Sequence, residues 1–545
     1  MKKFLKNPKV WYLLLFVIFI TFRLFTDNEA YFIGGDEAKY LKGALTFPKY
    51  LVWNNQFDVY NPPVLSALFA INGWVFGDLL RGAQLVELFF AILFFVYCIK
   101  LFKILNKKDE WIWIAMLFIS LAHEMTMMSY RLYKEQVYVA LFVMMLYYFL
   151  RAVRGENRHY ITTAVIGAIT AYTTDHLFLF IPILSLMLAV FYTKKTSITK
   201  AIACIAFIIL IYCSWLGIRI WIYETNDWYP AGVDGTPEYV HNYGLRQILS
   251  PSAFPSTVVL IGYEIGIRPA HAAAYLAYLL NLEPGLVPTD LTYDTARALL
   301  ALKPVLLMLL LYIPLIAIIL FGVWQSRKSL FPLPWRQKFL QGNIPFFFAV
   351  TYIILNIFII YKGFSNRYSL GAIIPLVFFL TEGMICWARK IRLDFRIIAK
   401  ILIATVLIVF LPLQIASHRT FVLAMPFEAD AQNTARFLAG LPNDGIMVQA
   451  GYTPEITWLT QPKRVLSLPR TPENLEALIK KYDIHYVVFG ERYWAMPVPE
   501  NREKVWDYDT IEYIKSNPAR FELIKTIPER YRTSGVDTLY VYRVR

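Results

Sequence analysis

Long apolar runs separated by short polar segments recur along most of the chain. A run of ~20 apolar residues is long enough to cross the hydrocarbon core of a bilayer as a helix. The shorter apolar run Val64–Phe76 predicts a helix that lies on the outer membrane surface. The longer runs predict about eleven transmembrane helices, at residues 11–25, 83–105, 111–129, 135–152, 159–174, 176–193, 198–223, 303–325, 343–362, 367–388 and 398–418.

Basic residues support this count of spans. With eleven spans, six connecting segments share one side, and every one of them is basic, from Lys2 and Lys3 before the first span to Arg396 and Lys400 before the last. Because basic loops remain in the cytoplasm, we expect a multi-pass protein of the cell (plasma or inner) membrane with a cytoplasmic N-terminus. One span more or fewer would break the alternation. Three long segments then face outward: residues 26–82, 225–302 and 419–545.

Composition agrees with a membrane protein and excludes other classes. Of the 545 residues, 57% are hydrophobic and 17% aromatic, whereas a soluble chain rarely gathers so many in long runs. The net charge of +15 is spread over loops, and no basic face on a soluble domain indicates nucleic-acid binding. The four cysteines all lie in apolar segments, so we expect neither a disulfide framework nor a cysteine metal site.

The chain changes character after about residue 418. Thr471-Pro472 is a typical helix start, with threonine as N-cap and proline at the first helical position. Strands alternating with helices predict a small extracytoplasmic α/β domain, residues 419–545, after a membrane domain of residues 1–418. Its expected role is acceptor binding or, more simply, scaffolding. The predicted strands are residues 446–450, 465–468, 484–489, 521–527 and 539–544.

The first outer segment carries an adjacent carboxylate pair, Asp36 and Glu37, just after two glycines. The pair begins a helix-like run, Asp36–Phe47, with Ala38, Leu41 and Leu45 on one face. Carboxylates held near lipid usually have a function. An aspartate at a helix N-terminus is also an ordinary N-cap, so both interpretations stay open.

Further charges fall on the outer side. Arg131 and Glu135 are four residues apart and share a helix face, with Lys134 between them. Arg367 and Tyr368 stand at the outer start of the tenth span. Arginine offers phosphate a bidentate fork, although such residues also serve as interfacial anchors.

The second outer segment offers weaker candidates. Arg268 and His271 are kept as substrate contacts. No set of three or four ligands accompanies any histidine, so no metal site is predicted.

These features together resemble the GT-C membrane glycosyltransferases. A first span, Asp-Glu-Ala-x-Tyr from Asp36, and then Asn61-Pro62-Pro63-Val64 are similar to the group with protein O-mannosyltransferases and lipid A aminoarabinose transferases, glycosyltransferase family 39 and relatives. Two residues depart from the pattern: Asn61 stands where His or Lys is usual, and Glu135 where Asp is usual. The resemblance covers nearly the whole chain and is specific in about the first 80 residues.

The resemblance implies transfer of a sugar from a polyprenyl-phosphate donor to a hydroxyl acceptor, on protein, lipid A or another glycan, at the extracytoplasmic face. Asp36 would be the general base for a single inverting displacement, and Glu37 would orient the helix or acceptor. Three cations would bind the leaving phosphate: Arg131, Lys134 and Arg367. The remaining substrate contacts would be Glu135, Asn61, Tyr368, Arg268 and His271. An Asp-Glu pair can hold a divalent metal, but this scheme requires no cofactor.

Two other classes compete with an enzyme. A transporter or flippase of a lipid-linked sugar would place charged or broken helices at mid-membrane, whereas most outer-side charges here gather near one surface. A membrane-anchored glycan-assembly protein would work through residues 419–545 and tolerate loss of Asp36.

Overall fold

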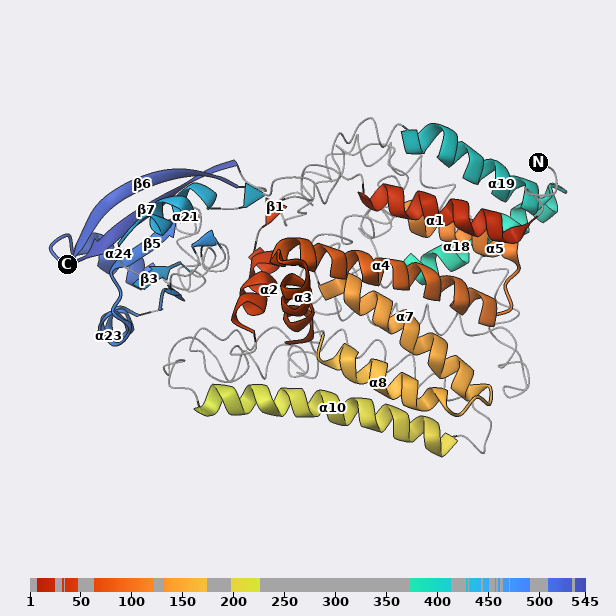
Figure 1. Cartoon of the computed structure of the whole chain (residues 1–545), viewed down its shortest axis with the longest axis horizontal. Coiled ribbons are helices and arrows are strands. Elements are labelled where there is room, and N and C mark those ends of the chain that lie inside the picture. Colours follow the sequence, from red (N-terminus) through yellow and green to blue (C-terminus); the bar gives the residue numbers. More distant parts are fainter. Residues whose placement is uncertain are drawn as a thin grey trace, which may run out of the picture.

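The structure is a computed structural model with a helical bundle at one end and a β-sheet at the other (Figure 1). The structure describes residues 7–24, 32–33, 35–47, 63–121, 132, 134–173, 198–225, 373–412, 428–429, 431–442, 445–449, 456, 459–460, 464–469, 471–490, 508–531 and 535–545. The spans predicted at 176–193, 303–325 and 343–362, and nearly all of the second outer segment, lie outside these ranges.

The bundle is built from apolar helices. They are α1 (Pro8–Leu24), α2 (Gly35–Thr46), α3 (Pro63–Phe76), α4 (Leu79–Ile104), α5 (Asp109–Leu121), α7 (Lys134–Val153), α8 (His159–Ala171), α10 (Ile198–Thr225), α18 (Ile373–Lys390) and α19 (Phe395–Thr405), which continues as a π-helical turn, Val406–Phe410. Among the described helices, three have the length and apolar composition to cross a membrane: α4, α7 and Ile198–Trp215 of α10. They coincide with spans predicted at 83–105, 135–152 and 198–223.

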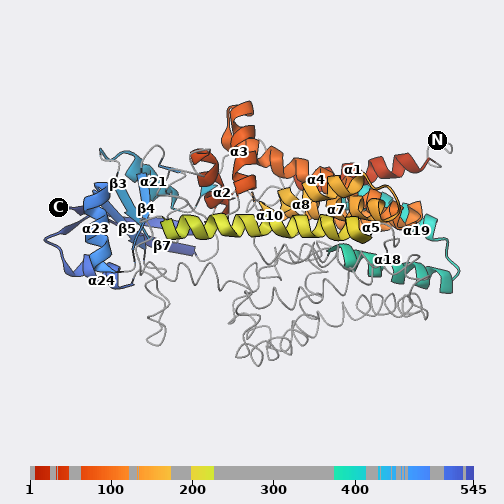
Figure 2. The same cartoon turned by 90° about the horizontal axis from the view of Figure 1, so that it is seen from below.

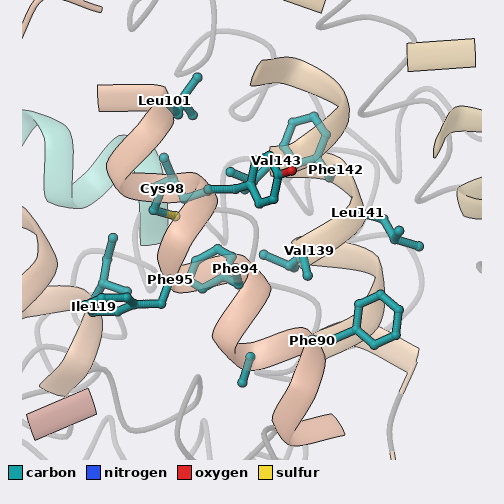
Figure 3. Packing of buried hydrophobic residues seen from close by; sticks show 14 of the residues in the cluster. Phe90, Phe94, Phe95, Cys98, Leu101, Ile119, Val139, Leu141, Phe142 and Val143 are labelled. Carbon is teal, nitrogen blue, oxygen red and sulfur yellow. The ribbon is translucent and has the colours of Figure 1, made fainter. Parts of the chain in front are cut away.

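The core of the bundle is packed most tightly between α4 and α7. Figure 3 shows Phe90, Phe94 and Cys98 of α4 beside Val139 and Phe142 of α7, and all of them are buried. Apolar side chains at intervals of three and four residues form one stripe on a helix, and the stripes of α4 and α7 meet here. This packing fixes the position of the α7 N-terminus relative to α4.

The last turns of α4 and α18, which carry Lys103 and Arg389, lie toward the end of the bundle where the chain begins (Figure 1), and Figure 2 shows α18 reaching that end from a second side. There Glu382 of α18 accepts hydrogen bonds from Lys107 and from Trp111 Nε1, the latter at 3.0 Å. Tyr12 of α1 donates to Asp109 of α5 at 2.6 Å. These contacts join α1, α5 and α18, and the opposite end of the bundle holds α2 and α3.

The sheet lies beyond that opposite end, and its strand order is β4-β3-β5-β7-β6. The strands are β3 (Gly445–Val448), β4 (Arg464–Ser467), β5 (Tyr486–Gly490), β6 (Phe521–Tyr531) and β7 (Gly535–Val544). β3 pairs in parallel with β4 and β5, whereas β7 runs antiparallel to both β5 and β6. All five overlap strands predicted from the sequence.

Helices cover both faces of this sheet. On one face Ile446 and Val488 pack with Leu438 of α21 (Gln432–Ala439). On the other, Val487 packs with residues of α23 (Pro472–Tyr482) and α24 (Tyr508–Ser516), among them Leu475. The central strands β3 and β5 are therefore buried on both sides, which accounts for their largely apolar sequences.

A second, two-stranded sheet connects the ends of the chain. β1 (Phe32–Ile33) pairs in parallel with β2 (Glu428–Ala429), with Phe32 opposite Glu428 and Ile33 opposite Ala429. β1 directly precedes α2, and β2 directly precedes α21. The segment that leads into the predicted catalytic pair is thus hydrogen-bonded to the segment that leads into the sheet.

Candidate active site

Helix α2 presents the predicted carboxylate pair at the end of the bundle that faces the sheet (Figure 1). The helix begins at Gly35, so Asp36 is its second residue and lies in the first turn. A negative charge in the first turn is favoured by the helix dipole. The structure therefore places Asp36 inside the helix, two positions beyond the N-cap position.

The buried face of α2 differs from the predicted one. Glu37, Tyr40, Leu41 and Ala44 are buried, at the spacing i, i+3, i+4 and i+7. The predicted buried face was defined by the apolar residues Ala38, Leu41 and Leu45 alone. It therefore did not include Glu37. Glu37, only 2% exposed, in fact lies on the side of α2 that packs against α3 and α4.

A hydrogen bond fixes the position of α2 on its neighbour. Ser66 Oγ of α3 donates to the Tyr40 carbonyl at 3.3 Å, and both groups are buried. α3 in turn crosses α4 so closely that a Cβ at Gly82 would lie 2.6 Å from the Gly73 nitrogen. The site is therefore supported by contacts along α2, α3 and α4 in succession.

The first residues of α7 supply a second group of polar side chains. Lys134 is 6% exposed and Glu135 is 2% exposed, and Gln136 is fully buried. Charged side chains are rarely buried to this extent unless they have partners or a function. The structure brings these two predicted substrate contacts to the beginning of a helix that packs along α4.

Two polar residues of α4 join this region and escaped the sequence analysis. Glu87 is fully buried and Gln84 is 2% exposed. Glu87 is close enough to Glu135 for the two carboxylates to repel each other electrostatically. The signal was present in the sequence, since a glutamate five residues into the span predicted at 83–105 is costly and therefore informative.

Arg23 is a third polar residue that sequence reasoning missed. It is fully buried at the end of α1, where its guanidinium lies 3.4 Å from the centre of the Phe19 ring. Its Nη1 donates to the Phe19 carbonyl at 3.1 Å. These contacts stabilise a buried cation near the end of the first helix.

Six predicted site residues lie outside the described ranges. Within those ranges, no three His, Cys, Asp or Glu side chains come together as metal ligands. The six residues are Asn61, Arg131, Arg268, His271, Arg367 and Tyr368.

Solved structures of an archaeal oligosaccharyltransferase share this fold. AglB from Archaeoglobus fulgidus, in complex with an inhibitory peptide and a dolichol-phosphate, gives a TM-score of 0.51 at 13% identity, over 97% of this chain and 74% of that one. The complex of the Archaeoglobus fulgidus oligosaccharyltransferase with Zn and sulfate gives 0.52 at 12%, over 91% and 70%. ArnT from Cupriavidus metallidurans bound to undecaprenyl phosphate gives 0.43 at 11%, over 97% and 96%. No family model and no curated protein matches the chain.

The chain therefore shares its fold with these oligosaccharyltransferase structures, and the predicted resemblance to GT-C proteins is confirmed at the level of the fold. The particular relatives are oligosaccharyltransferase structures that share the arrangement of this chain over most of its length.

Proposed function

We propose that this chain is a membrane glycosyltransferase that moves a sugar from a polyprenyl-phosphate donor to a hydroxyl acceptor. The observation that carries the proposal is the burial of Glu37 on α2 and of Lys134 and Glu135 on α7, two helices that both pack against α4 in a fold shared with an oligosaccharyltransferase. The solved AglB complex with a dolichol-phosphate supports a lipid-phosphate donor.

The proposed reaction requires the protein to supply a general base and cations. Asp36 removes the proton of the acceptor hydroxyl, and the acceptor oxygen attacks the anomeric carbon. The bond from that carbon to the lipid phosphate breaks in the same step, so the configuration at the anomeric carbon inverts. General-base catalysis of this kind contributes roughly 10²–10⁴-fold. Glu37, on the buried face of α2, orients that helix.

The leaving phosphate needs preorganised positive charge. Lys134 is the first residue of α7, so its ammonium group and the positive end of the helix dipole lie together. Arg131 and Arg367 complete this set in the proposal. No metal is required. The C-terminal sheet, outside the membrane with the acceptor side, supports or binds the acceptor.

Basic helix ends favour one orientation of the chain. Because basic segments face the cytoplasm, the end of the bundle with α2 and the sheet faces outward in this proposal. The N-terminus is then cytoplasmic, in the plasma or inner membrane.

The proposal is tested by replacing Asp36. Cells with and without the chain are compared by mass spectrometry of surface glycans and proteins, and the sugar missing without it identifies the product. Asp36→Asn should abolish that product at an unchanged level of membrane insertion.

Asp78→Asn is the matched control. Asp78 caps α4 by accepting from Leu80 N at 3.0 Å, and asparagine caps a helix equally well. Full transfer by Asp36→Asn would exclude Asp36 as the base. Product formation that does not depend on the chain at all would exclude a transferase.

A further inference from the structure

Gln84 and Glu87 of α4 are buried polar side chains without hydrogen-bond partners in the described part of the chain. Both amide atoms of Gln84 and both carboxylate oxygens of Glu87 share this property. An uncompensated buried carboxylate is among the most unfavourable groups a fold can contain. Such residues persist in membrane proteins because they have a function.

The helix geometry gives both residues a common direction. They are three residues apart and therefore adjacent on the surface of α4. Gly82 lies on the side of α4 that touches α3. Because each residue turns an α-helix by about 100°, Gln84 and Glu87 lie about 140–160° around the helix axis from Gly82. They point away from the crossing with α3.

The partner on that side is α7. Glu87 and Phe94 are seven residues apart and lie on one stripe of α4, and Figure 3 shows Phe94 beside Val139 of α7. The interaction between Glu87 and Glu135 agrees with this direction. Gln84, Glu87 and Glu135 thus form one polar cluster near the N-terminal end of α7.

Charge decides what such a cluster binds. Gln84, Glu87 and Glu135 supply no positive charge for a phosphate, so the matching ligand part is neutral and polar. Sugar hydroxyls both donate and accept, whereas carboxylates accept and the glutamine amide does both. Sugar hydroxyls would also supply the hydrogen bonds that Gln84 and Glu87 lack within the described structure.

We propose that Gln84, Glu87 and Glu135 bind the hydroxyl groups of the sugar on the lipid-linked donor and select that sugar. This inference rests on the proposed function. It adds α4 to the site and assigns the cluster to the sugar, while Lys134 remains with the phosphate. A site built to hydrogen-bond a hydroxyl also rejects analogues that lack it.

The experiment uses the full chain in lipid nanodiscs without acceptor. Two kinds of probe are compared: undecaprenyl phosphate, and undecaprenyl phosphate carrying mannose, arabinose or 4-aminoarabinose. Glu87→Gln should weaken binding of the preferred sugar donor about tenfold, the loss of one hydrogen bond to a charged group. Binding of undecaprenyl phosphate should stay within about twofold, since it has no sugar.

A stability readout separates binding from a structural role. Glu87→Leu removes the buried charge, so it should raise the thermal stability of the ligand-free chain and still lose the sugar preference. Thr163→Val is the control, because its buried hydroxyl already donates to His159 O at 2.7 Å. It should leave the binding of both kinds of probe unchanged.

The outcomes separate this inference from the proposed function. A wild-type chain that binds undecaprenyl phosphate but prefers no sugar donor, and that forms no product in cells, overturns the proposed function. A wild-type preference that survives in both Glu87→Gln and Gln84→Ala overturns the sugar site alone. So does a Glu87→Leu chain that is destabilised and loses both probes equally.

Discussion

Buried polar residues in the bundle fall into two kinds. Ser120, Thr163, Thr170 and Thr381 each donate a hydroxyl hydrogen to the carbonyl four residues earlier, at 2.7 Å. Their burial therefore costs little and needs no functional explanation. Glu87 differs, because neither of its carboxyl oxygens has a hydrogen-bond partner in the described structure.

A residue-scale prediction concerns the loop between α7 and α8. Arg151 donates from Nε to Glu156 Oε1 at 2.8 Å, and this hydrogen bond holds the pKa of Glu156 below its ordinary value. Glu156 is therefore more readily ionised in the folded chain than in the unfolded chain, where its pKa is about 4.3. The stabilisation is complete above that pH and is lost as pH falls through the lower, folded pKa.

The measurement is the thermal stability of the detergent-solubilised chain between neutral pH and acid. Stability of the wild-type chain should fall in the acidic range partly through Glu156. Glu156→Gln should be less stable near neutral pH and should lose less on acidification. Because the pair is exposed, the difference should be small and should shrink with added salt. Identical pH profiles for the two chains would contradict this role.

At the scale of elements, the crossing of α3 and α4 depends on the absence of side chains. A Cβ at Gly82 would lie 2.7 Å from Asn72 C as well as 2.6 Å from Gly73 N, and both of those atoms are backbone. Gly77, with φ +70°, makes the turn between the two helices, a conformation that favours glycine. Because α2 rests on α3, this crossing also sets the position of Asp36.

Gly82→Ala should therefore destabilise the chain. Alanine gains ~1 kcal/mol over glycine in helix propensity, but overpacking against backbone costs about 1–3 kcal/mol and should outweigh it. Thermal unfolding in detergent is the measurement, with transfer activity falling alongside. Gly440→Ala is the control, since its Cβ would meet nothing closer than 3.5 Å. A Gly82→Ala chain as stable as the wild type would contradict this prediction. It would mean that α3 and α4 can move apart without loss of stability.

The sequence predicted individual elements better than the contacts between them. Thr471 does cap α23 with Pro472 in its first turn, and the limits of α2 are within a residue or two of those predicted. Local signals determine such features. The predicted buried face of α2 was wrong, because Glu37 lies on the side that packs against α3 and α4. Only the packing between helices reveals this. Gln84 and Glu87 were overlooked because their span was interpreted by average hydrophobicity.

At the scale of the whole molecule, the pairing of β1 with β2 is one contact that links the bundle to the sheet region, beside the packing of Leu459 against the bundle core. Ile33 is opposite Ala429, and two residues separate Ile33 from the start of the Asp36–Glu37 pair. A further contact anchors α21, which follows β2. Glu529 of β6, itself buried, accepts from Asn433 N at 3.3 Å and from Thr434 N. Hydrogen bonds therefore connect β6 to the start of α21, and β2 to β1, which lies just before Asp36.

A disulfide tests this pairing. Directly opposed positions on neighbouring strands lie within the Cα separation that a disulfide spans, about 4.4–6.8 Å. Ile33→Cys with Ala429→Cys should cross-link readily under oxidation and keep transfer activity, read by mobility on a non-reducing gel. Phe32→Cys with Ala429→Cys is one residue out of register and should cross-link poorly. Equal yields for both pairs would contradict the parallel register.

The same pairing has a consequence for how the protein is made. β1 belongs to the first part of the chain to be synthesised, whereas β2 follows the last described helix of the bundle. Helix α2 can form early, but the segment before it acquires its partner only near the end of translation. Chains truncated before β2 would therefore enter the membrane with an immature site. If the proposed function holds, late pairing of this kind keeps an incomplete chain from acting on a lipid-linked donor.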